Sequence, residues 1–579
     1  MKYSRWFAVL AAVPLLGAGA VPASAAPPQI SARAYLSGQN PQGMAALAKA
    51  VSDPAGPAYR HFLSAQQFWH DFGPTPAQTT EVQDELRAAG ATVTGATSHY
   101  VAFTASPAQV EAWAKAAPDH VIAVVPVAGN GSPAQQANDA ETDAPATACS
   151  HYYGEVVVKS LPEAYGRTEF PATSCGYLPS QLRKAYGVTH SGLTGKGVKI
   201  GVVGIGTDPQ FENSLNADAT AFGDKAFAPG QFAQRYPTGQ SSVCDEPTWG
   251  IEREMDATIA HGMAPDADVV YSAANCAADK TDPQATMISL LDGLDRLVDD
   301  RAVDVVSTSW TTLDSNVSPA MIAAWDQTFQ QSAIEGIGLY YSSGDKGDNS
   351  AGGTRAPQTE YPASDPWVTA VGGTTLEVDK NSDYLFETGW GTTETDSSGD
   401  GKTWSTSPPG SFNTGTGGGR SALFHQPPYQ NGVVPAALSK GDRVVPDVAV
   451  DADFYAGLAV PDPLPGGLTN GGTSLASPLF AAIQADAQQA AGTPIGFANP
   501  LLYAHHGSAL FHDVTDHPFG GTTVARVVSE TDEHGNALPG TATLITDGHD
   551  GALTATPGYD DVTGLGSPAL GYLAAFSTR

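Results

Sequence analysis

The chain has 579 residues, about four times a typical domain length, so a single small module is excluded. Hydrophobic residues make up 41% of the chain, and 63 Gly with 43 Pro indicate a loop-rich globular protein rather than a coiled coil. Acidic residues outnumber basic ones 60 to 28, a net charge of −32, which argues against a nucleic-acid binder. A chain with few Lys and Arg repels itself less in acid, so this balance suits acidic surroundings, although a generic soluble secreted protein also fits.

Residues 1–25 are typical of a signal peptide. Lys2 and Arg5 form a basic start, an apolar run follows from Trp6 to Val21, and Ala23-Ser24-Ala25 fits a signal-peptidase site. A membrane anchor is the alternative, but the run is short for a membrane span and contains a proline. We therefore expect a secreted, extracellular protein without a membrane anchor.

Residues 26–127 carry the patterns of a small α+β domain. Helical periodicity covers Met44–Val51 and Thr80–Ala89, and extended runs cover His99–Thr104 and Val121–Val127.

A linker and processing region is expected over residues 128–176. Its first part, Ala128–Ala148, contains almost no bulky apolar residues, which is typical of an exposed segment that proteases cut.

The chain has four cysteines, which in a secreted protein allow two disulfides in three connectivities. Short local loops favour Cys149–Cys175 and Cys244–Cys276, although sequence alone leaves the connectivity open.

Residues 177–579 alternate strand-like and helical runs, which predicts an α/β fold with a parallel sheet covered by helices on both faces. The strand-like runs are Gly197–Gly206, Asp268–Ala273, Val303–Trp310 and Gly338–Ser343, and the helical runs are Pro283–Asp299 and Pro319–Ile334.

The strongest local motif is Gly471-Gly472-Thr473-Ser474-Leu475-Ala476-Ser477-Pro478, followed by an apolar helical run. A serine at the start of a helix lies near free backbone N–H groups, which can stabilise an oxyanion. Ser474 is therefore a candidate nucleophile, and a simple helix N-cap is the alternative.

A serine nucleophile needs a base, and His261 in Ala260-His261-Gly262 is the first candidate. The subtilisin pattern fails, however, because the chain has no His-Gly-Thr-His stretch. Upstream, Glu252 and Asp256 are four residues apart and share one helix face, while His261 lies about 180° around that helix from Glu252. In a desolvated cleft two close carboxyls share a proton; an ordinary solvated helix face is the alternative.

Asp345 follows the strand-like run that ends in Ser343-Gly344. The carboxyl ends of parallel strands are where α/β sheets build their sites. Two alternatives are a simple turn and a calcium loop of Asp345, Asp348 and Asn349, although the residues of an EF-hand are not in register.

Together these residues resemble the sedolisin family of serine-carboxyl peptidases. Glu252-x-x-x-Asp256, Ser343-Gly344-Asp345 and Gly472-Thr473-Ser474-x-x-x-Pro478 stand in the family's order. Supporting stretches are Val306–Trp310, Tyr361–Ser364, Val371–Thr374 and Gly417–Ser421, with a prosegment-like Tyr59–Ser64 and a domain start at Leu178. The resemblance covers essentially the whole chain. It implies a subtilisin-like catalytic domain at 177–579 and a prokumamolisin-type propeptide at 26–127, which would act as an intramolecular inhibitor of a self-processing zymogen.

The resemblance assigns a role to each of four residues. Ser474 would be the nucleophile, Glu252 the general base, Asp256 its hydrogen-bonded partner, and Asp345 a protonated donor to the oxyanion. A carboxyl base and a neutral Asp345 together imply activity at acid pH, roughly 3 to 5. A secreted, monomeric endopeptidase acting on proteins or peptides is expected. A tripeptidyl-peptidase of the same family and a histidine-based subtilase remain as alternatives.

The resemblance also implies one calcium ion and a substrate-binding region. The calcium ligands would be the carboxylates of Asp513 and Asp560 and the carbonyls of Val514, Thr556 and Gly558, a set of oxygens that suits a hard cation. The insertion at 516–555 is longer than expected between the two halves of this site.

Trp310 and Glu360 are the expected substrate-binding residues. Glu360 would line a subsite and favour a basic substrate side chain, with a solvent-facing loop acid as the alternative.

Overall fold

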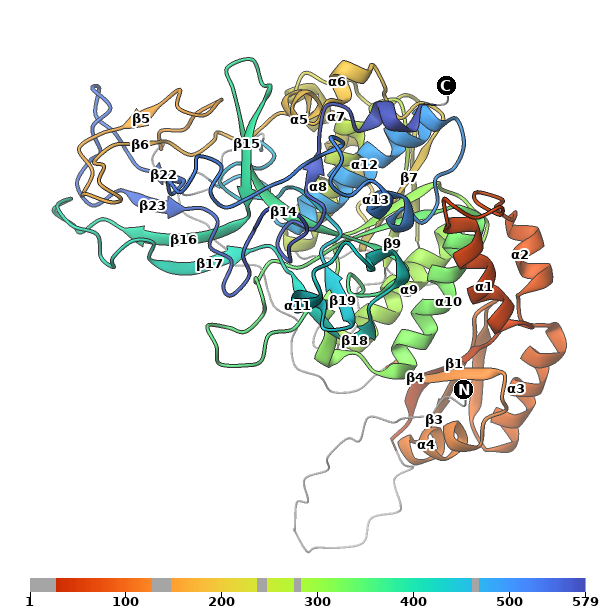
Figure 1. The fold of residues 1–579 in the computed structure, drawn as a ribbon. Coiled ribbons are helices and arrows are strands. Elements are labelled where there is room, and N and C mark those ends of the chain that lie inside the picture. The colour runs from red at the N-terminus through yellow and green to blue at the C-terminus, as the bar shows by residue number, and fades with distance from the viewer. Residues whose placement is uncertain (1–27, 128–146, 237–246, 275–282, 461–467, 578–579) are drawn as a thin grey trace, which may run out of the picture.

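The computed structural model describes residues 28–127, 147–236, 247–274, 283–460 and 468–577 (Figure 1). Its N-terminal part is an α+β domain, as expected. A four-stranded antiparallel sheet in the order β2-β3-β1-β4 is flanked by helices, three of which begin with a Ser or Thr cap and a Gln three residues later. The elements are β1 (Ile30–Leu36), α1 (Pro41–Ser52), α2 (Ala65–Asp71), α3 (Pro76–Ala88), β2 (Thr92–Ala96), β3 (Tyr100–Ala105), α4 (Pro107–Ala116) and β4 (Val121–Pro126).

The second part is built on a large sheet in the order β15-β14-β12-β10-β7-β9-β8, with β20 also paired to β14. All of its pairs are parallel except β14 with β15. The four strand-like runs of the sequence are four of these strands. The strands are β7 (Lys199–Ile205), β8 (Phe232–Arg235), β9 (Asp268–Ala274), β10 (Val305–Thr308), β12 (Gly338–Ser342), β14 (Thr369–Val378), β15 (Tyr384–Gly389) and β20 (Val448–Asp451).

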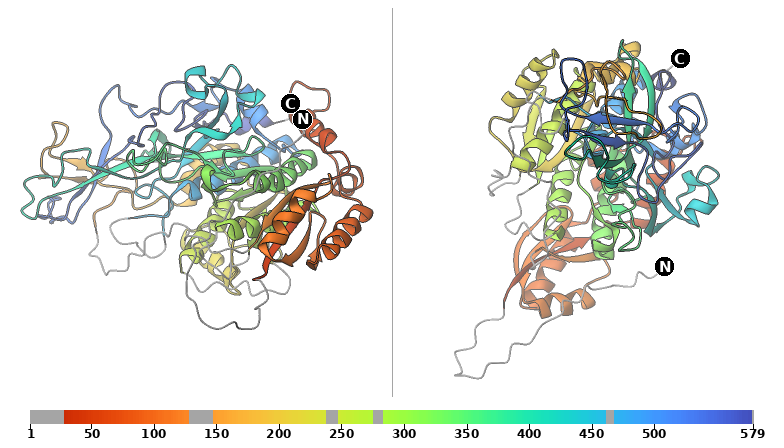
Figure 2. Two further views of the ribbon diagram at one scale, coloured as in Figure 1. Left: turned by 90° about the horizontal axis from the view of Figure 1, so that it is seen from below. Right: turned by 90° about the vertical axis from the view of Figure 1, so that its left-hand side faces the viewer.

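Helices cover both faces of this sheet, which confirms the predicted α/β fold (Figures 1 and 2). One face packs against α8 (Pro247–Met263) and α12 (Thr473–Ala491), and the other against α9 (Pro283–Val298) and α10 (Pro319–Glu335).

Within the described ranges, no helix is long and apolar enough to cross a membrane. The remaining helices are α5 (Pro179–Ala185), α6 (Val188–Ser191), α7 (Phe211–Ala221), α11 (Ala436–Ser439) and α13 (Asn499–Ala504). Short strand pairs are β11 (Thr312–Leu313) with β13 (Glu360–Tyr361), β18 (Gly419–His425) with β19 (Asp442–Val445), and β21 (Phe511–His512) with β24 (Ser567–Pro568).

A second sheet projects from the domain of the large sheet as an arm, at the left of Figure 1. The insertion 516–555 supplies two of its four antiparallel strands, in the order β17-β16-β23-β22. Buried Arg526 joins this arm to the domain, because its guanidinium pairs with Asp547 at 2.6 Å and also with Asp453. The strands are β16 (Gly391–Asp396), β17 (Ser411–Gly415), β22 (Ala525–Val528) and β23 (Thr543–Thr546).

Residues 147–176, the second part of the predicted linker and processing region at 128–176, are folded onto the arm. They form the hairpin of β5 (Val157–Val158) and β6 (Phe170–Pro171), and Phe170 is buried together with Val527 and Leu544 of the arm. The predicted Cys149–Cys175 disulfide is present in this segment. Apolar burial therefore attaches these residues to the arm of the larger domain. Residues 128–146, the predicted signal peptide at 1–25 and the predicted Cys244–Cys276 pair lie outside the described residues.

The N-terminal domain docks against α9 and α10 of the larger domain. Arg33 of β1 forms a bidentate ion pair with Asp292 of α9, in which each guanidinium Nη lies 2.6 Å from a carboxylate oxygen. His99 is buried and its Nε2 lies 2.7 Å from an Asp299 carboxylate oxygen. Tyr35, Ala123 and Val125 of the domain's sheet lie in the same apolar cluster as the two helices, so docking combines apolar burial with charge pairing.

Candidate active site

Two of the predicted site residues lie where β12 ends and α12 begins. Asp345 lies three residues beyond the end of β12, and Ser474 is the second residue of α12. This is the carboxyl edge of the parallel strands, where α/β sheets commonly build their sites.

Gly472 lets the chain enter α12 against the Asp345 carboxyl. Its φ of 84° lies in the left-handed region, and a Cβ added there would stand 2.8 Å from Asp345 Oδ2. Asp345 Oδ1 accepts hydrogen bonds from the Thr473 N–H and the Thr473 hydroxyl, both at 2.8 Å. The carboxyl is thereby fixed one residue away from the Ser474 N–H.

Burial raises the pKa of Asp345, while the two hydrogen bonds from Thr473 pull it in the other direction. With Oδ1 held as an acceptor, a proton on Oδ2 would leave this carboxyl as a donor beside Ser474.

Pro478 frees the backbone carbonyl of Ser474. Proline has no N–H, so the helical bond that residue 478 would donate to the carbonyl four residues earlier cannot form. The Ser309 hydroxyl lies 3.1 Å from this carbonyl oxygen and 2.8 Å from Asp256 Oδ1. Ser309 follows β10 and thus links the nucleophile's backbone to the acid pair.

Glu252 and Asp256 both lie on α8, as the spacing predicted. Asp256 is 1% exposed, and its Oδ2 and the Oε1 of Glu252 are buried without a hydrogen-bond partner among the described residues. Burial raises the pKa of Glu252 to about 7, the hydroxyls of Ser474 and Ser309 favour its ionised form, and Asp345 disfavours it. Burial and the neighbouring Glu252 raise the pKa of Asp256 well above its usual value. This pair is therefore suited to holding one shared proton.

His261 lies away from this site. It is 2% exposed, its Nε2 lies 2.7 Å from the Lys225 carbonyl oxygen, and its ring stacks on Phe227 at 3.8 Å. Burial lowers its pKa. Its contacts are those of a structural core histidine, so the geometry does not support the histidine-based alternative.

Of the two expected substrate-binding residues, Trp310 follows Ser309 directly and is half-buried. Glu360 lies beside the Asp345 loop, because a Cβ on Gly344 would stand 2.5 Å from its carboxyl oxygen. Asn349 Nδ2 donates to that carboxyl at 3.1 Å, and the Thr311 hydroxyl also donates to it. Burial raises the pKa of Glu360 to about 7, so in acid it is a neutral group.

The two halves of the expected calcium site are adjacent, despite the insertion between them. Both carboxylate oxygens of Asp513 accept from the Gly558 N–H, at 3.0 and 3.1 Å, and Asp560 accepts from the N–H of Thr556 at 3.1 Å. Among the hydrogen bonds of the described residues, none ends on the carbonyl oxygens of Val514, Thr556 or Gly558. Two carboxylates and three carbonyls therefore fit an oxygen-liganded cation.

No group of three or more His, Cys, Asp or Glu side chains in the described part of the chain is arranged to hold a metal ion.

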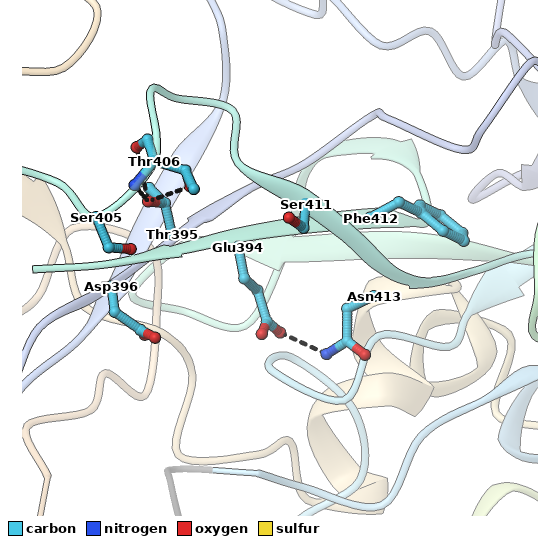
Figure 3. Close-up of a pocket in the computed structure, with 8 residues that line it drawn as sticks. All are labelled: Glu394, Thr395, Asp396, Ser405, Thr406, Ser411, Phe412 and Asn413. Carbon is cyan, nitrogen blue, oxygen red and sulfur yellow. Dashed lines mark hydrogen bonds between the residues drawn. The ribbon is translucent and has the colours of Figure 1, made fainter. Parts of the chain in front are cut away.

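A cleft of about 370 Å³ lies on the arm between β16 and β17 (Figure 3). Glu394 lines it and accepts from Asn413 at 2.7 Å, but none of the four catalytic candidates does.

Comparison with known families separates the chain into the same two domains. Residues 19–117 match the family model of the pro-kumamolisin activation domain, and residues 244–505 match that of the subtilase family. The chain is 30% identical to kumamolisin of Bacillus sp. (strain MN-32) over 411 residues, which are 69% of this chain and 63% of the relative. The chain thus combines a pro-kumamolisin activation domain with a subtilase-like domain, and kumamolisin is one of its homologues.

Two further homologues extend the match over most of the chain. Sedolisin of Pseudomonas sp. (strain 101) is 28% identical over 503 residues, covering 81% of this chain and 78% of its own. Human tripeptidyl-peptidase 1 is 25% identical over 594 residues, covering 93% and 90%. The solved structure of Pseudomonas sedolisin, complexed with pseudo-iodotyrostatin, has the same fold, with a TM-score of 0.52 and 24% identity over 69% of this chain and 97% of that one.

Ser309 and Thr473 also contact the site residues, and both lie in motifs of the sequence that pointed to other positions. The signal for Ser309 was available in two features: its place at the end of a central parallel strand, and a proline four residues after Ser474 that frees a carbonyl.

Proposed function

We propose that this protein is a secreted acid endopeptidase that hydrolyses peptide bonds with Ser474 as nucleophile and Glu252 as general base. The observation that carries the proposal is the buried pair of Glu252 and Asp256, placed so that the Ser474 hydroxyl affects the pKa of Glu252. His261, the histidine nearest to Glu252 in sequence, is occupied elsewhere.

In this mechanism Glu252 takes the Ser474 proton as Oγ attacks the scissile carbonyl carbon, and later gives it to the leaving amine. The tetrahedral oxyanion forms beside the Ser474 N–H and a protonated Asp345, which donates a hydrogen bond to it. Asp256 shares its proton with Glu252 and so keeps one of the two carboxyls ionised.

The test is hydrolysis of internally quenched peptides by acid-activated enzyme. Ser474→Ala and Glu252→Gln are each expected to lower kcat/KM by about 1,000-fold or more, as losses within a catalytic unit do. Glu254→Gln, on the same helix, is the matched control and is expected to retain activity. Full activity in Glu252→Gln would refute the assignment.

The same assay separates the two activities found in the family. An endopeptidase cleaves a peptide whose N-terminus is acetylated, whereas a tripeptidyl-peptidase requires the free N-terminus and releases three residues. Cleavage confined to free N-termini would assign the alternative.

We further propose that the N-terminal domain keeps the chain as a zymogen that processes itself in acid. Because residues 147–176 are folded onto the arm, cleavage before residue 147 would leave them with the mature enzyme. Incubation of full-length Ser474→Ala at low pH tests this. The chain should remain intact, and efficient maturation without added protease would contradict self-processing.

A calcium ion would be held by Asp513 and Asp560 with the carbonyls of Val514, Thr556 and Gly558. When bound, it supplies positive charge that neutralises Asp560, a carboxylate that is 2% exposed. The two chain segments on either side of the insertion would thus be joined near the C-terminal end of the domain.

A further inference from the structure

Asp550, in the insertion, is buried without any partner for its charge. It is 3% exposed, and neither of its carboxylate oxygens has a hydrogen-bond partner among the described residues. No ion pair of the described residues ends on it. A bare buried carboxylate is strongly unfavourable, so this side chain requires either a proton or a cation.

The surroundings of Asp550 are a second acidic loop. Its Oδ1 lies against Gly347, while the Asp348 carboxylate lies against Gly551, 3.3 Å from where a Cβ would stand. The two loops are therefore in contact: the Asp550 carboxylate faces Gly347, next to Asp348, and the Asp348 carboxylate faces Gly551, next to Asp550. Asp348 is 5% exposed, and its Oδ1 accepts a hydrogen bond from the Ser350 N–H at 2.9 Å.

The negative charge extends beyond these two carboxylates. Asp516 and Asp561 are close enough to act on Asp550, and with burial they raise its pKa well above the usual value. No ion pair with a Lys, Arg or His in the described ranges ends on any of the four.

A proton on Asp550 would leave its carboxyl without a hydrogen-bond acceptor. A protonated carboxyl is a hydrogen-bond donor and needs an acceptor when it is buried. The buried Asp326 and Asp365 meet this need by bonding to each other. Asp550 has no such contact with any neighbouring carboxylate. A divalent cation needs no donor geometry from the carboxylate, and it takes backbone carbonyls and water as its remaining ligands.

We propose that Asp550 and Asp348 bind a calcium-like divalent cation, at a site separate from Asp513 and Asp560. The bound ion joins the insertion to the loop that begins at Asp345. That loop also bonds to the arm, because the Asp345 carbonyl oxygen accepts from the Thr414 hydroxyl at 2.8 Å. The cation therefore stabilises the loop that carries Asp345, the proposed hydrogen-bond donor to the oxyanion.

Calcium uptake by full-length Ser474→Ala protein tests the site without depending on peptidase activity, so its outcome is distinct from that of the proposed function. The protein is stripped with EDTA, dialysed at pH 7 and titrated with CaCl2 in a calorimeter. Asp550→Asn and Asp348→Asn are each expected to lose one equivalent of calcium. Asp400→Asn, an exposed carboxylate on the arm, is the matched control and should retain full uptake. Asp513→Asn should retain the Asp550 site.

Unchanged calcium uptake in both Asp550→Asn and Asp348→Asn would overturn the proposal, and would identify Asp550 as a buried neutral acid. The two variants alter different loops, so if one of them fails to fold the other still decides the question. Calcium should also raise Tm less in these variants than in Asp400→Asn, and an equal rise would count against the site.

Discussion

At the scale of single residues, the Ser309 hydroxyl connects the nucleophile to the acid pair. It lies within hydrogen-bond distance of Asp256 and of the Ser474 carbonyl, which Pro478 leaves without a helical donor. One hydroxyl proton serves only one acceptor well. A proton on Asp256 would let that carboxyl donate to Ser309, and Ser309 would then donate to the carbonyl.

Ser309→Ala is expected to lower kcat by about 10- to 100-fold with little change in KM, because a buried acceptor without a partner costs about 1–3 kcal/mol. It should also shift the pH profile, since Asp256 loses its hydroxyl partner. Ser309→Thr, which keeps the hydroxyl, is the control and should restore part of the rate. A loss of Tm without any shift in the pH profile would reduce Ser309 to a structural role.

Glu360 is a second residue whose role depends on its protonation. Its pKa of about 7 makes it neutral at pH 4, so it can attract a basic substrate side chain by charge only near neutrality. We expect the ratio of kcat/KM for Arg- over Leu-containing peptides to rise between pH 4 and 6, and Glu360→Gln to abolish the rise. A pH-independent preference that survives the substitution would refute the subsite role.

At the scale of elements, α9 and the residue that follows it present Asp292 and Asp299 to the N-terminal domain. Burial alone lowers the pKa of His99, but Asp295 and Asp299 raise it to about 9. The contribution of His99 to docking is thus fully present below about pH 6.5 and is lost as pH rises through 9. Release in acid must therefore come from protonation of carboxylates rather than from His99.

The ion pair of Arg33 with Asp292 gives a direct test of that conclusion. Asp292→Asn removes the negative charge from this ion pair and weakens docking, so self-processing is expected about 10-fold faster at mildly acid pH. The measurement is the half-life of the full-length chain on gels, with the exposed Asp84→Asn as control. An unchanged half-life would show that this pair does not restrain the zymogen.

Prediction from sequence succeeded where a local pattern decides the element. Periodicity identified α9 and α10, and the four-residue spacing of Glu252 and Asp256 placed both on α8. The packing of residues 147–176 and of the arm was not predicted. Their strands are only two to six residues long, and they are held by Phe170, Val527 and Leu544, which are far apart in the chain. No local pattern encodes such distant packing.

At the scale of the whole molecule, the net charge of −32 coexists with many buried carboxyls of raised pKa. Asp486 on α12 is 0% exposed, and burial raises its pKa to about 8. Because this folded-state value lies above that of the unfolded chain, its contribution to stability is fully present below about pH 4. It is lost as pH rises to about 8. Such groups favour stability in acid.

Asp486→Asn should therefore raise Tm at pH 8 and leave it nearly unchanged at pH 4. Thermal unfolding of the variant in the inactive Ser474→Ala background measures this without self-digestion. A variant that loses stability equally at both pH values would show that the carboxyl is ionised and partnered in the folded state.

The pH profile of kcat/KM for a quenched peptide, measured on wild type, Glu252→Gln and His261→Ala, tests the central claim most directly. Activity should fall as pH rises and Asp345 and the Glu252–Asp256 pair lose their protons. It should be abolished by the Glu252 change and survive the His261 change. Activity that peaks at neutral or alkaline pH and disappears with His261 would contradict the carboxyl-base mechanism.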